Sequence, residues 1–441
     1  MRILAVTTLL AVLLGGCSAT IPVSTVKASQ ISVLAKHQIY IDKKGRLLNP
    51  KTGDRDVNEN EYVDYILQNI DAARSKNPDL ELLVFIHGGL NKFDKSNRRV
   101  KETAGSILAA GKYPLYISWD SGPFTNYGDP LFKLRRGERV EILGPLSSPF
   151  VLAEDVLRSV ARIPASLYYT LFGQNSVSLT ISDSQEAAAA RAVKELGAGS
   201  FTLHNNPKDR GLGPGHWATI WNPVKLVVAP FVDVLGTGSW NSMLRRTDLV
   251  LRKDVAFGGG GDRDSETAAS RLFSRLEERG DKMKIRIVGH SMGAIVANNI
   301  IARNNQLEFS NIVYMAAACS LKDLEVVVAP YLEAHEGAQF FSLTLNPYMD
   351  IVENTFYDFV PRGSLLMWID QTLASTNSFQ DRTAGFWFNL VRGAMTAFKN
   401  PDIRPRVHLT QFGINDHTPQ THGDFSDYSF WDERFWRGEV H

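Results

Sequence analysis

The hydrophobic pattern of the first 120 residues predicts strands that alternate with helices. Continuous apolar runs at Leu82–Ile86 and Tyr113–Ser118 are typical of strands that are covered on both faces of a sheet. Residues 58–75 carry acidic residues first and then apolar residues at helical spacing, which predicts an amphipathic helix. Before this helix, residues 37–50 predict a small hairpin with its turn at Gly45.

The same alternation resumes near residue 264. We expect a helix that is capped by Asp264 or Ser265 and stopped by Gly280. Further strands are expected at 285–288, 311–318, 339–345 and 406–412. Strands separated by helices predict an α/β fold, in which a mostly parallel sheet is flanked by helices on both faces. Ligands of such sheets bind at the carboxyl ends of the strands.

Between these two stretches the alternation stops. From 123 to 262 the chain has Pro, Gly and Trp interruptions around helical patches at 150–169 and 222–235. Gly258–Gly261 is typical of a flexible joint. We therefore expect a core made of residues 31–122 and 263–441, with 123–262 inserted as a mainly helical lid or cap.

The N-terminus has the pattern of a secretory signal. One Arg and a dozen mostly apolar residues precede Leu14-Gly15-Gly16-Cys17, and this apolar run is too short to span a bilayer. The ending resembles a bacterial lipobox, in which the signal is cleaved before a lipidated Cys. The resemblance implies a signal peptide at 1–16, a lipidated tether at 17–30 and a membrane anchor on Cys17. Ser18, in place of Asp, points to the periplasmic face of the outer membrane.

An ordinary secretory signal that contains a cysteine is the alternative for this segment. Only two cysteines occur, Cys17 and Cys319, so a disulfide framework is excluded. Cys319 is expected to be a small buried hydrophobe rather than a chemical group. The net charge of +1, from 48 Lys and Arg against 47 Asp and Glu, argues against an electrostatic nucleic-acid binder.

A candidate nucleophile lies in IRIVGHSMGAIVANN, residues 285–299. A GxSxG string by itself is a weak signal, because a chain of this length with 34 Gly contains one by chance at an appreciable rate. Here, however, strand-like residues precede it and apolar residues at helical spacing follow it. This is the context of a nucleophile elbow, which holds a serine on a strained turn between strand and helix. Ser291 is therefore the expected nucleophile.

A serine nucleophile needs a base and a carboxylate that orients the base. His422 follows the last expected strand within Thr421-His-Gly-Asp424 and is our candidate base, with His417 as the alternative. Asp350 comes first after the strand at 339–345 and is our candidate acid. Glu353, one helical turn later, is the alternative acid, and exposed surface carboxylates remain possible for both.

The oxyanion formed in such a reaction needs two backbone N–H donors. One would come from Met292, directly after the nucleophile. The other would come from Gly89, in the His87-Gly88-Gly89-Leu90 segment that follows the strand at 82–86. Glycines at a strand end allow the backbone to approach an oxyanion closely.

Together these motifs resemble the α/β-hydrolase fold superfamily over roughly residues 80–120 and 264–425. The resemblance implies a serine esterase or lipase-like enzyme that uses neither a metal nor an organic cofactor. In its pattern Ser291 is the nucleophile, His422 the base and Asp350 the acid. One departure is the long insertion before the nucleophile strand, where family members usually carry the lid after the strand that follows the nucleophile helix.

The expected function is a membrane-anchored serine hydrolase that cleaves carboxylic esters, with a small ester or a lipid as substrate. The tether, and the apolar Trp217, Trp221 and Phe231 in the insertion, favour a lipid or another acyl compound. An inactive scaffold lipoprotein of the envelope is the alternative from another class. An acyltransferase, thioesterase or peptidase with the same triad also remains open.

Overall fold

The computed structural model describes residues 27–121, 191–203, 223–252, 266–353, 363–412 and 417–439, with short gaps at 32, 90, 92, 281–282, 375 and 377, and isolated residues between 134 and 161. The predicted signal peptide, Cys17, the joint at 258–261 and the helix cap at Asp264 or Ser265 lie outside the described residues.

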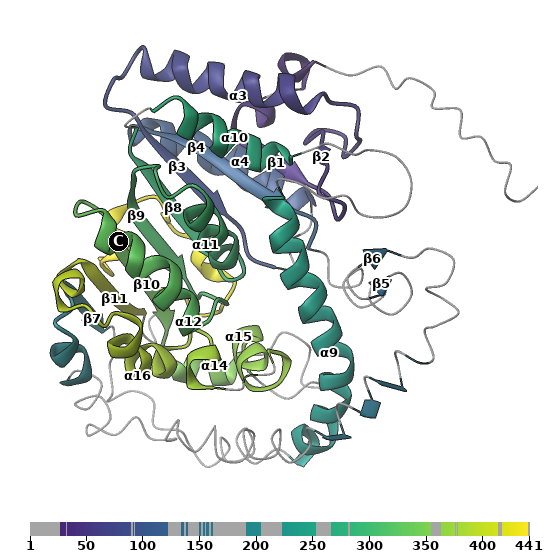
Figure 1. The fold of residues 1–441 in the computed structure, drawn as a ribbon, viewed down its shortest axis with the longest axis vertical. Helices are drawn as coiled ribbons and strands as arrows, with labels where there is room; N and C mark the ends of the chain where they lie inside the picture. Colours follow the sequence, from purple (N-terminus) through teal and green to yellow (C-terminus); the bar gives the residue numbers. More distant parts are fainter. Residues whose placement is uncertain are drawn as a thin grey trace, which may run out of the picture.

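The protein is an α/β protein with a nine-stranded, mostly parallel sheet (Figure 1). The strand order is β2-β1-β4-β3-β8-β9-β10-β11-β7, and only the β1–β2 pairing in this sheet is antiparallel. The strands are β1 Gln38–Ile41, β2 Leu47–Leu48, β3 Glu81–Ile86, β4 Lys112–Trp119, β7 Ser200–Leu203, β8 Ile285–His290, β9 Phe309–Met315, β10 Gln339–Leu345 and β11 Val407–Phe412; β5 Leu134–Arg135 and β6 Glu138–Arg139 form a separate pair.

Alternate residues along the central strands enter two different cores, so the sheet is buried on both faces. Val84 and Ile287 belong to one core, whereas their neighbours Phe85 and Val288 belong to the other. The first core is closed by α3 Glu59–Arg74, α10 Ala268–Glu278, α11 Gly293–Arg303, α13 Ala329–Ala334 and α16 Trp387–Ala397. The second is closed by α4 Phe93–Ala109 and the C-terminal segment around α17 Glu433–Trp436. The continuous apolar runs of the sequence follow from this double burial.

Apart from α9 Pro223–Val250, the remaining helical pieces are short. They are α2 Leu34–His37, α12 Leu321–Asp323, α14 Pro347–Val352, α15 Leu365–Trp368, π-helical turns at Leu324–Val328 and Ile369–Leu373, and 3₁₀ turns at Ala28–Gln30, Phe379–Asp381, Pro401–Arg406 and Asp424–Asp427. The predicted hairpin is present as β1 and β2, and Gly45 has a positive φ of 81° in its turn. The predicted cap of α10 is wrong: Thr267 caps it, because its side chain accepts the N–H of Ser270.

The strand order creates a switch point beside β3. After β3 the chain passes through α4 to β4 on one side, whereas β8 lies on the other side of β3 and leads through α11 to β9. Connections that leave in opposite directions open a crevice at the carboxyl ends of the two strands. The Gly88-Gly89 segment and Ser291 both follow directly from these ends.

The expected insertion at 123–262 contributes to the sheet, which the sequence pattern did not predict. Residues 200–203 form β7, which pairs in parallel with β11 at the sheet edge. A single helix, α9 Pro223–Val250, replaces the shorter helical patch expected at 222–235. This helix packs against α11 and the π-helical turn at 369–373. In the part of the chain that the structure describes, no helix combines the length and apolarity needed to span a membrane.

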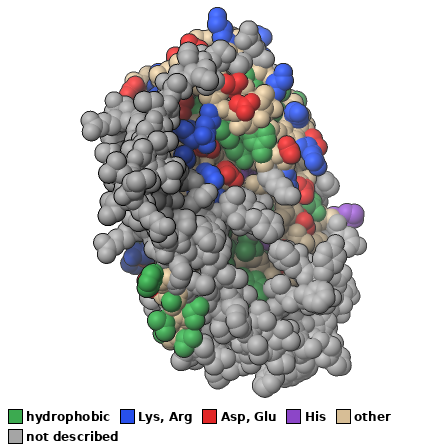
Figure 2. All heavy atoms as spheres, turned by 90° about the vertical axis from the view of Figure 1, so that its right-hand side faces the viewer, with side chains coloured by type: hydrophobic (Ala, Val, Ile, Leu, Met, Phe, Trp, Pro, Cys, Tyr) green, Lys and Arg blue, Asp and Glu red, His purple; other side chains and the backbone are tan. Residues whose placement is uncertain are grey.

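Charged side chains of both signs are interspersed on the surface. On the face seen in Figure 2, basic and acidic side chains alternate over the upper half, the end that carries α3 and α10. Two ion pairs join these helices, Arg275 with Asp64 and Arg279 with Asp71, the second at 3.0 Å. Exposed pairs of this kind contribute little to stability.

Candidate active site

Ser291 lies on a strained turn between β8 and α11. Its φ is +53°, in the left-handed region that non-glycine residues rarely adopt. The turn is held by two main-chain bonds: Ser291 N–H donates to the Met315 carbonyl at 2.9 Å, and Ala318 N–H donates to the Ser291 carbonyl at 3.0 Å. Gly293 is required because a Cβ there would come 2.2 Å from the Ile86 carbonyl oxygen. The expected elbow geometry is therefore present at Ser291.

The structure brings His422 into contact with this serine. His422 Nε2 lies 2.8 Å from Ser291 Oγ, although 131 residues separate them in the chain. Both side chains are buried. His417, the alternative base, is exposed on the same loop. The hydroxyl is thus within reach of a base that can take its proton.

Burial keeps the His422 ring neutral. Desolvation lowers the pKa of His422 to about 4, so at pH 7 the ring can accept a proton. When Nε2 accepts the Ser291 hydroxyl, the ring proton is on Nδ1. This Nδ1 is buried and has no hydrogen-bond partner among the described residues. An N–H donor left without an acceptor in the interior is costly, and a nearby carboxylate would remove that cost.

Asp350 is the expected acid, but the structure shows no hydrogen bond between its carboxylate and His422 Nδ1. It is 1% exposed, and within the described part of the chain neither of its oxygens accepts a hydrogen bond. Burial raises the pKa of Asp350 to about 8; the nearby Ser364 hydroxyl opposes this shift and the Glu353 carboxylate adds to it. Ser364 itself caps α15 by accepting the N–H of Met367. Asp350 is therefore a buried acid that lies beside the Ser364 hydroxyl and makes no hydrogen bond to the His422 ring.

Glu353, the alternative acid, makes a different contact. Its Oε2 accepts the backbone N–H of His422 at 2.9 Å. Burial raises the pKa of Glu353 to about 7, and this bond to His422 opposes the shift. Glu353 therefore holds the main chain of the base and not its ring.

Both acids follow β10, which pairs with β11, the strand that leads to the base. Asn346 N–H, at the end of β10, donates to the Phe412 carbonyl at the end of β11 at 2.8 Å. Asp350 and Glu353 follow from β10 at i and i+3, so they face the same side of a helical turn. Glu353 reaches the main chain of His422, whereas Asp350, one turn earlier, makes no hydrogen bond to it.

The Gly88-Gly89 segment packs directly on the elbow. A Cβ on Gly88 would come 2.8 Å from Ser291 Cβ, and a Cβ on Gly89 would come 2.8 Å from Met292 Sδ. Any side chain on Gly88 would therefore displace the nucleophile. Within the described part of the chain, neither Gly89 nor Met292 donates its backbone N–H to another protein group.

The Gly88 carbonyl is anchored by two side chains. His87 Nδ1–H donates to it at 2.6 Å, and Asn91 Nδ2 donates to it at 3.0 Å. His87 Nε2 accepts the Trp119 N–H at 3.1 Å, and burial lowers the pKa of His87 to about 3, so its ring stays neutral. Because C=O and N–H of a trans peptide point in opposite directions, anchoring this carbonyl also sets the direction of the Gly89 N–H.

The sequence analysis missed two further residues near the site. His290, directly before the nucleophile, contacts the main chain of His422. Arg99 of α4 is buried, lies 5.4 Å from the centre of the Phe85 ring and donates to Ser426 Oγ at 2.8 Å. Ser426 belongs to the 3₁₀ turn Asp424–Asp427 just after the base. The position of His290 in the motif was a possible signal; Arg99 had none.

Cys319 is buried beside the elbow. Its side chain is 1% exposed, and burial raises the pKa of the thiol well above its usual value. A thiol in this state is not a nucleophile at neutral pH. Among the described residues no group of three or more His, Cys, Asp or Glu side chains is placed to hold a metal ion.

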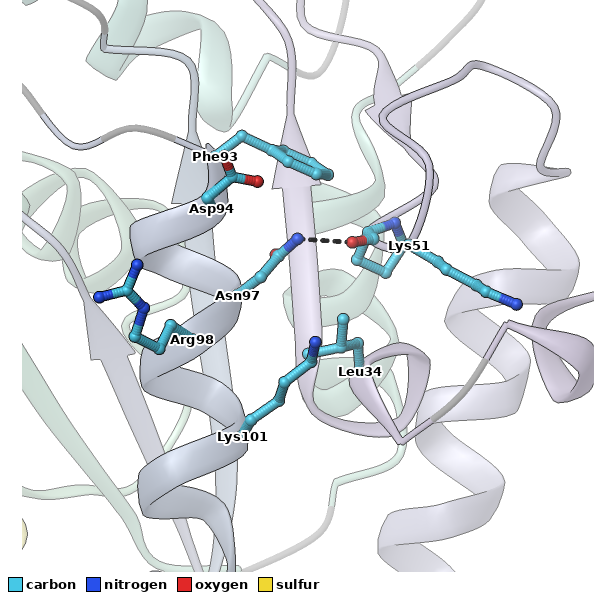
Figure 3. Close-up of a pocket in the computed structure, with 8 residues that line it drawn as sticks. Leu34, Lys51, Phe93, Asp94, Asn97, Arg98 and Lys101 are labelled. Atoms are coloured by element: carbon cyan, nitrogen blue, oxygen red, sulfur yellow. Dashed lines mark hydrogen bonds between the residues drawn. The ribbon is translucent and has the colours of Figure 1, made fainter.

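Two described cavities lie away from the triad candidates. One of about 460 Å³ lies between α4 and residues 50–51, where Asn97 Nδ2 donates to the Pro50 carbonyl at 2.6 Å (Figure 3). Figure 3 shows the side chains of Lys51 and Arg98 extending to opposite sides, so their charges do not converge on one point. The other, of about 630 Å³, lies at the amino ends of β9 and β10, whereas Ser291 follows the carboxyl end of β8.

The chain matches no protein-family model, no curated protein and no solved structure.

Proposed function

We propose that this protein is a serine hydrolase of the α/β-hydrolase fold that cleaves carboxylic esters. The observation that carries the proposal is the 2.8 Å contact between His422 Nε2 and Ser291 Oγ, made at a serine with positive φ between a strand and a helix. Nucleophile, acid and base follow in the chain order Ser291, Asp350, His422, as in that fold.

The residues have separate roles in this reaction. Ser291 Oγ attacks the ester carbonyl carbon while His422 Nε2 takes its proton. The resulting imidazolium is stabilised by the Asp350 carboxylate, which has to turn towards the Nδ1–H because the two groups make no hydrogen bond in this structure. The negative charge that forms on the carbonyl oxygen is stabilised by the N–H groups of Gly89 and Met292.

The reaction then proceeds through an acyl-enzyme. His422 returns its proton to the leaving alcohol as the C–O bond breaks, which leaves the acyl group on Ser291. Water attacks the acyl-enzyme with His422 again as base, and the acid is released. No metal or organic cofactor takes part in these steps.

We further propose that the enzyme is anchored to the bacterial outer membrane through a lipidated Cys17. The lipobox-like Leu14-Gly15-Gly16-Cys17 supports this, as does the short polar segment that follows it. An enzyme tethered by a lipid encounters acyl compounds of the envelope, so lipid esters are the proposed substrates.

A fluorophosphonate probe tests the proposed chemistry, because it phosphonylates activated serines. We expect the wild-type protein to be labelled, Ser291→Ala to remain unlabelled and His422→Ala to be labelled far more slowly. Ser310→Ala, which removes a half-buried serine at the far end of β9, is the matched control and keeps wild-type labelling. Failure of the folded wild type to react contradicts the proposal and favours the scaffold alternative.

The acyl acceptor and substrate class need a second measurement. p-Nitrophenyl esters of rising chain length, assayed beside a thioester and a peptide, separate an esterase from the other enzymes that use this triad. We expect turnover of the esters to exceed that of the other two, and a preference for longer chains if lipids are the substrates. Turnover of only the peptide or thioester contradicts the proposed ester specificity.

A further inference from the structure

The main chain of His422 is held from both sides by two side chains, those of half-buried Glu353 and buried His290. Glu353 Oε2 accepts its N–H at 2.9 Å, and His290 Nε2 lies 2.8 Å from its carbonyl oxygen. The two bonds therefore bracket the residue whose ring contacts Ser291.

The direction of the His290 bond follows from its acceptor. A carbonyl oxygen can only accept, so His290 Nε2 carries the hydrogen and donates it. Burial, followed by the neighbouring His422, lowers the pKa of His290 well below its usual value, so the ring is neutral. A neutral imidazole has a single N–H, and His290 uses it on His422. Its Nδ1 is buried without a partner in the described part of the chain.

The two bonds connect three strand ends. His290 is the last residue of β8 and directly precedes the nucleophile, whereas Glu353 follows α14 after β10. His422 lies on the loop after β11. A loop residue is thus fixed to the same strand that positions Ser291, so base and nucleophile are held as one unit.

We propose that His290 and Glu353 are positioning residues, which hold the main chain of His422 so that its Nε2 stays at hydrogen-bond distance from Ser291. This inference rests on the proposed hydrolase function. Neither side chain touches the reacting atoms; both act through the base. Small displacements of a catalytic group lower rates strongly, by about 100-fold for roughly 1 Å.

The test compares variants that remove the bond with variants that keep it. His290→Met and Glu353→Met are similar in length to the native side chains but make neither bond. His290→Gln keeps an N–H donor, and Glu353→Gln keeps an oxygen acceptor. The readouts are the rate of fluorophosphonate labelling at Ser291, kcat and KM for an ester, the melting temperature, and deuterium exchange of the 417–425 segment.

The chain offers matched controls for both bonds. His37 Nδ1–H donates to the Pro114 carbonyl at 3.0 Å, and Glu59 Oε1 accepts the Leu47 N–H at 3.0 Å, both away from the active site. His37→Met and Glu59→Met remove the same kinds of bond there. These two variants show how much the labelling rate and the melting temperature change when a bond of the same kind is lost away from the active site.

We expect His290→Met and Glu353→Met to lower the labelling rate and kcat by about 10- to 100-fold with little change in KM. Deuterium exchange should rise at 417–425 in both. The Gln variants should recover most of the rate, and the two control variants should keep the wild-type rate even where they lower the melting temperature.

The outcomes separate the two proposals. If wild-type Ser291 is labelled but the Met variants match wild type in both rate and exchange, the positioning role is wrong and the hydrolase stands. If wild type is never labelled but exchange at 417–425 still rises in the Met variants alone, the hydrolase is wrong and the hold on His422 stands. Rate losses that the Gln variants fail to recover also overturn the positioning role.

Discussion

Two buried aspartates, twenty residues apart, have opposite surroundings. Asp370, in the π-helical turn at 369–373, accepts from Arg382, from the N–H and hydroxyl of Thr383 and from Asn389. Asp350 accepts from none of the described residues, although it is as deeply buried. Burial alone therefore does not distinguish a structural carboxylate from one that is available for chemistry.

The difference lies in what each carboxylate joins. Asp370 ties the segment at 382–389 to its own turn, and that segment packs closely against the chain after β9: a Cβ on Gly385 would come 2.1 Å from Ala317 N. Asp350 makes no such tie, because its oxygens are buried without a hydrogen-bond partner among the described residues. Buried groups without partners cluster at functional sites, because the stability they cost is retained only where the reaction needs them.

The largest effect that tests this comparison is expected in catalysis. Asp350→Asn keeps the shape of the side chain but cannot stabilise an imidazolium, so kcat for an ester should fall by about 10³- to 10⁴-fold. Asp370→Asn should change kcat by less than about tenfold. Steady-state kinetics of both variants check this. Equal losses of kcat in the two variants would contradict a specific role of Asp350 in catalysis.

The next largest effect is on stability, and here we expect Asp370 to matter more than Asp350. Asp370→Ala leaves the Arg382 guanidinium without its buried partner, so we expect the free energy of unfolding to fall by about 3–5 kcal/mol. Urea unfolding followed by circular dichroism measures this, with Asp370→Asn as the milder variant if the alanine protein does not fold. A loss below about 1 kcal/mol would contradict a structural role for the Asp370 network.

A pH dependence of stability should distinguish Asp350 as well. Its pKa is about 8 in the folded protein against about 3.9 in an unfolded chain, so ionisation costs the folded state stability as pH rises between these values. Asp350→Asn avoids this cost. The variant should gain on the order of 3 kcal/mol over wild type between pH 5 and pH 9 in urea unfolding. A constant difference across this range would show that Asp350 is not an unpartnered buried acid.

The smallest effect concerns the rate profile. Because Asp350 must be ionised to stabilise the imidazolium, kcat/KM should rise with pH towards about 8. The Glu353 carboxylate helps to raise this pKa, so Glu353→Gln should move the rise to lower pH by less than about one unit. Initial rates from pH 5 to 9.5 measure both profiles. A midpoint near 6.5 in wild type would instead indicate an ordinary, solvated histidine.

Much of the fold followed from local pattern. The strands at 82–86, 113–118 and 339–345, and the helix at 58–75, are present within a few residues of the expected bounds. Fully buried parallel strands leave continuous apolar runs, and such runs are readable without any contact information. The cap of α10 was misplaced by two or three residues, because Thr267, Ser265 and Asp264 are all good caps and only the folded chain selects one.

The pattern was insufficient where a segment depends on distant partners. β7 is four residues long, and it is a strand because β11 offers it a free edge. No periodicity in four residues can predict such a pairing. The same limit applies to Glu353, whose carboxylate could equally have been placed on the ring of His422 or on the surface.

The sequence by itself determined the elbow at Ser291, the glycines that pack on it and the chain order of the residues after β8, because strained turns and close backbone approaches require particular residue types at particular positions. Only the tertiary structure decided that His422 rather than His417 contacts Ser291, that Glu353 and His290 hold the main chain of His422, and that Asp350 is buried without a partner. The contacts join residues more than sixty positions apart, and the burial of Asp350 depends on the elements that pack around it. The pairing of the strands decides the contacts and the packing decides the burial, so neither can be read from the spacing of residues along the chain.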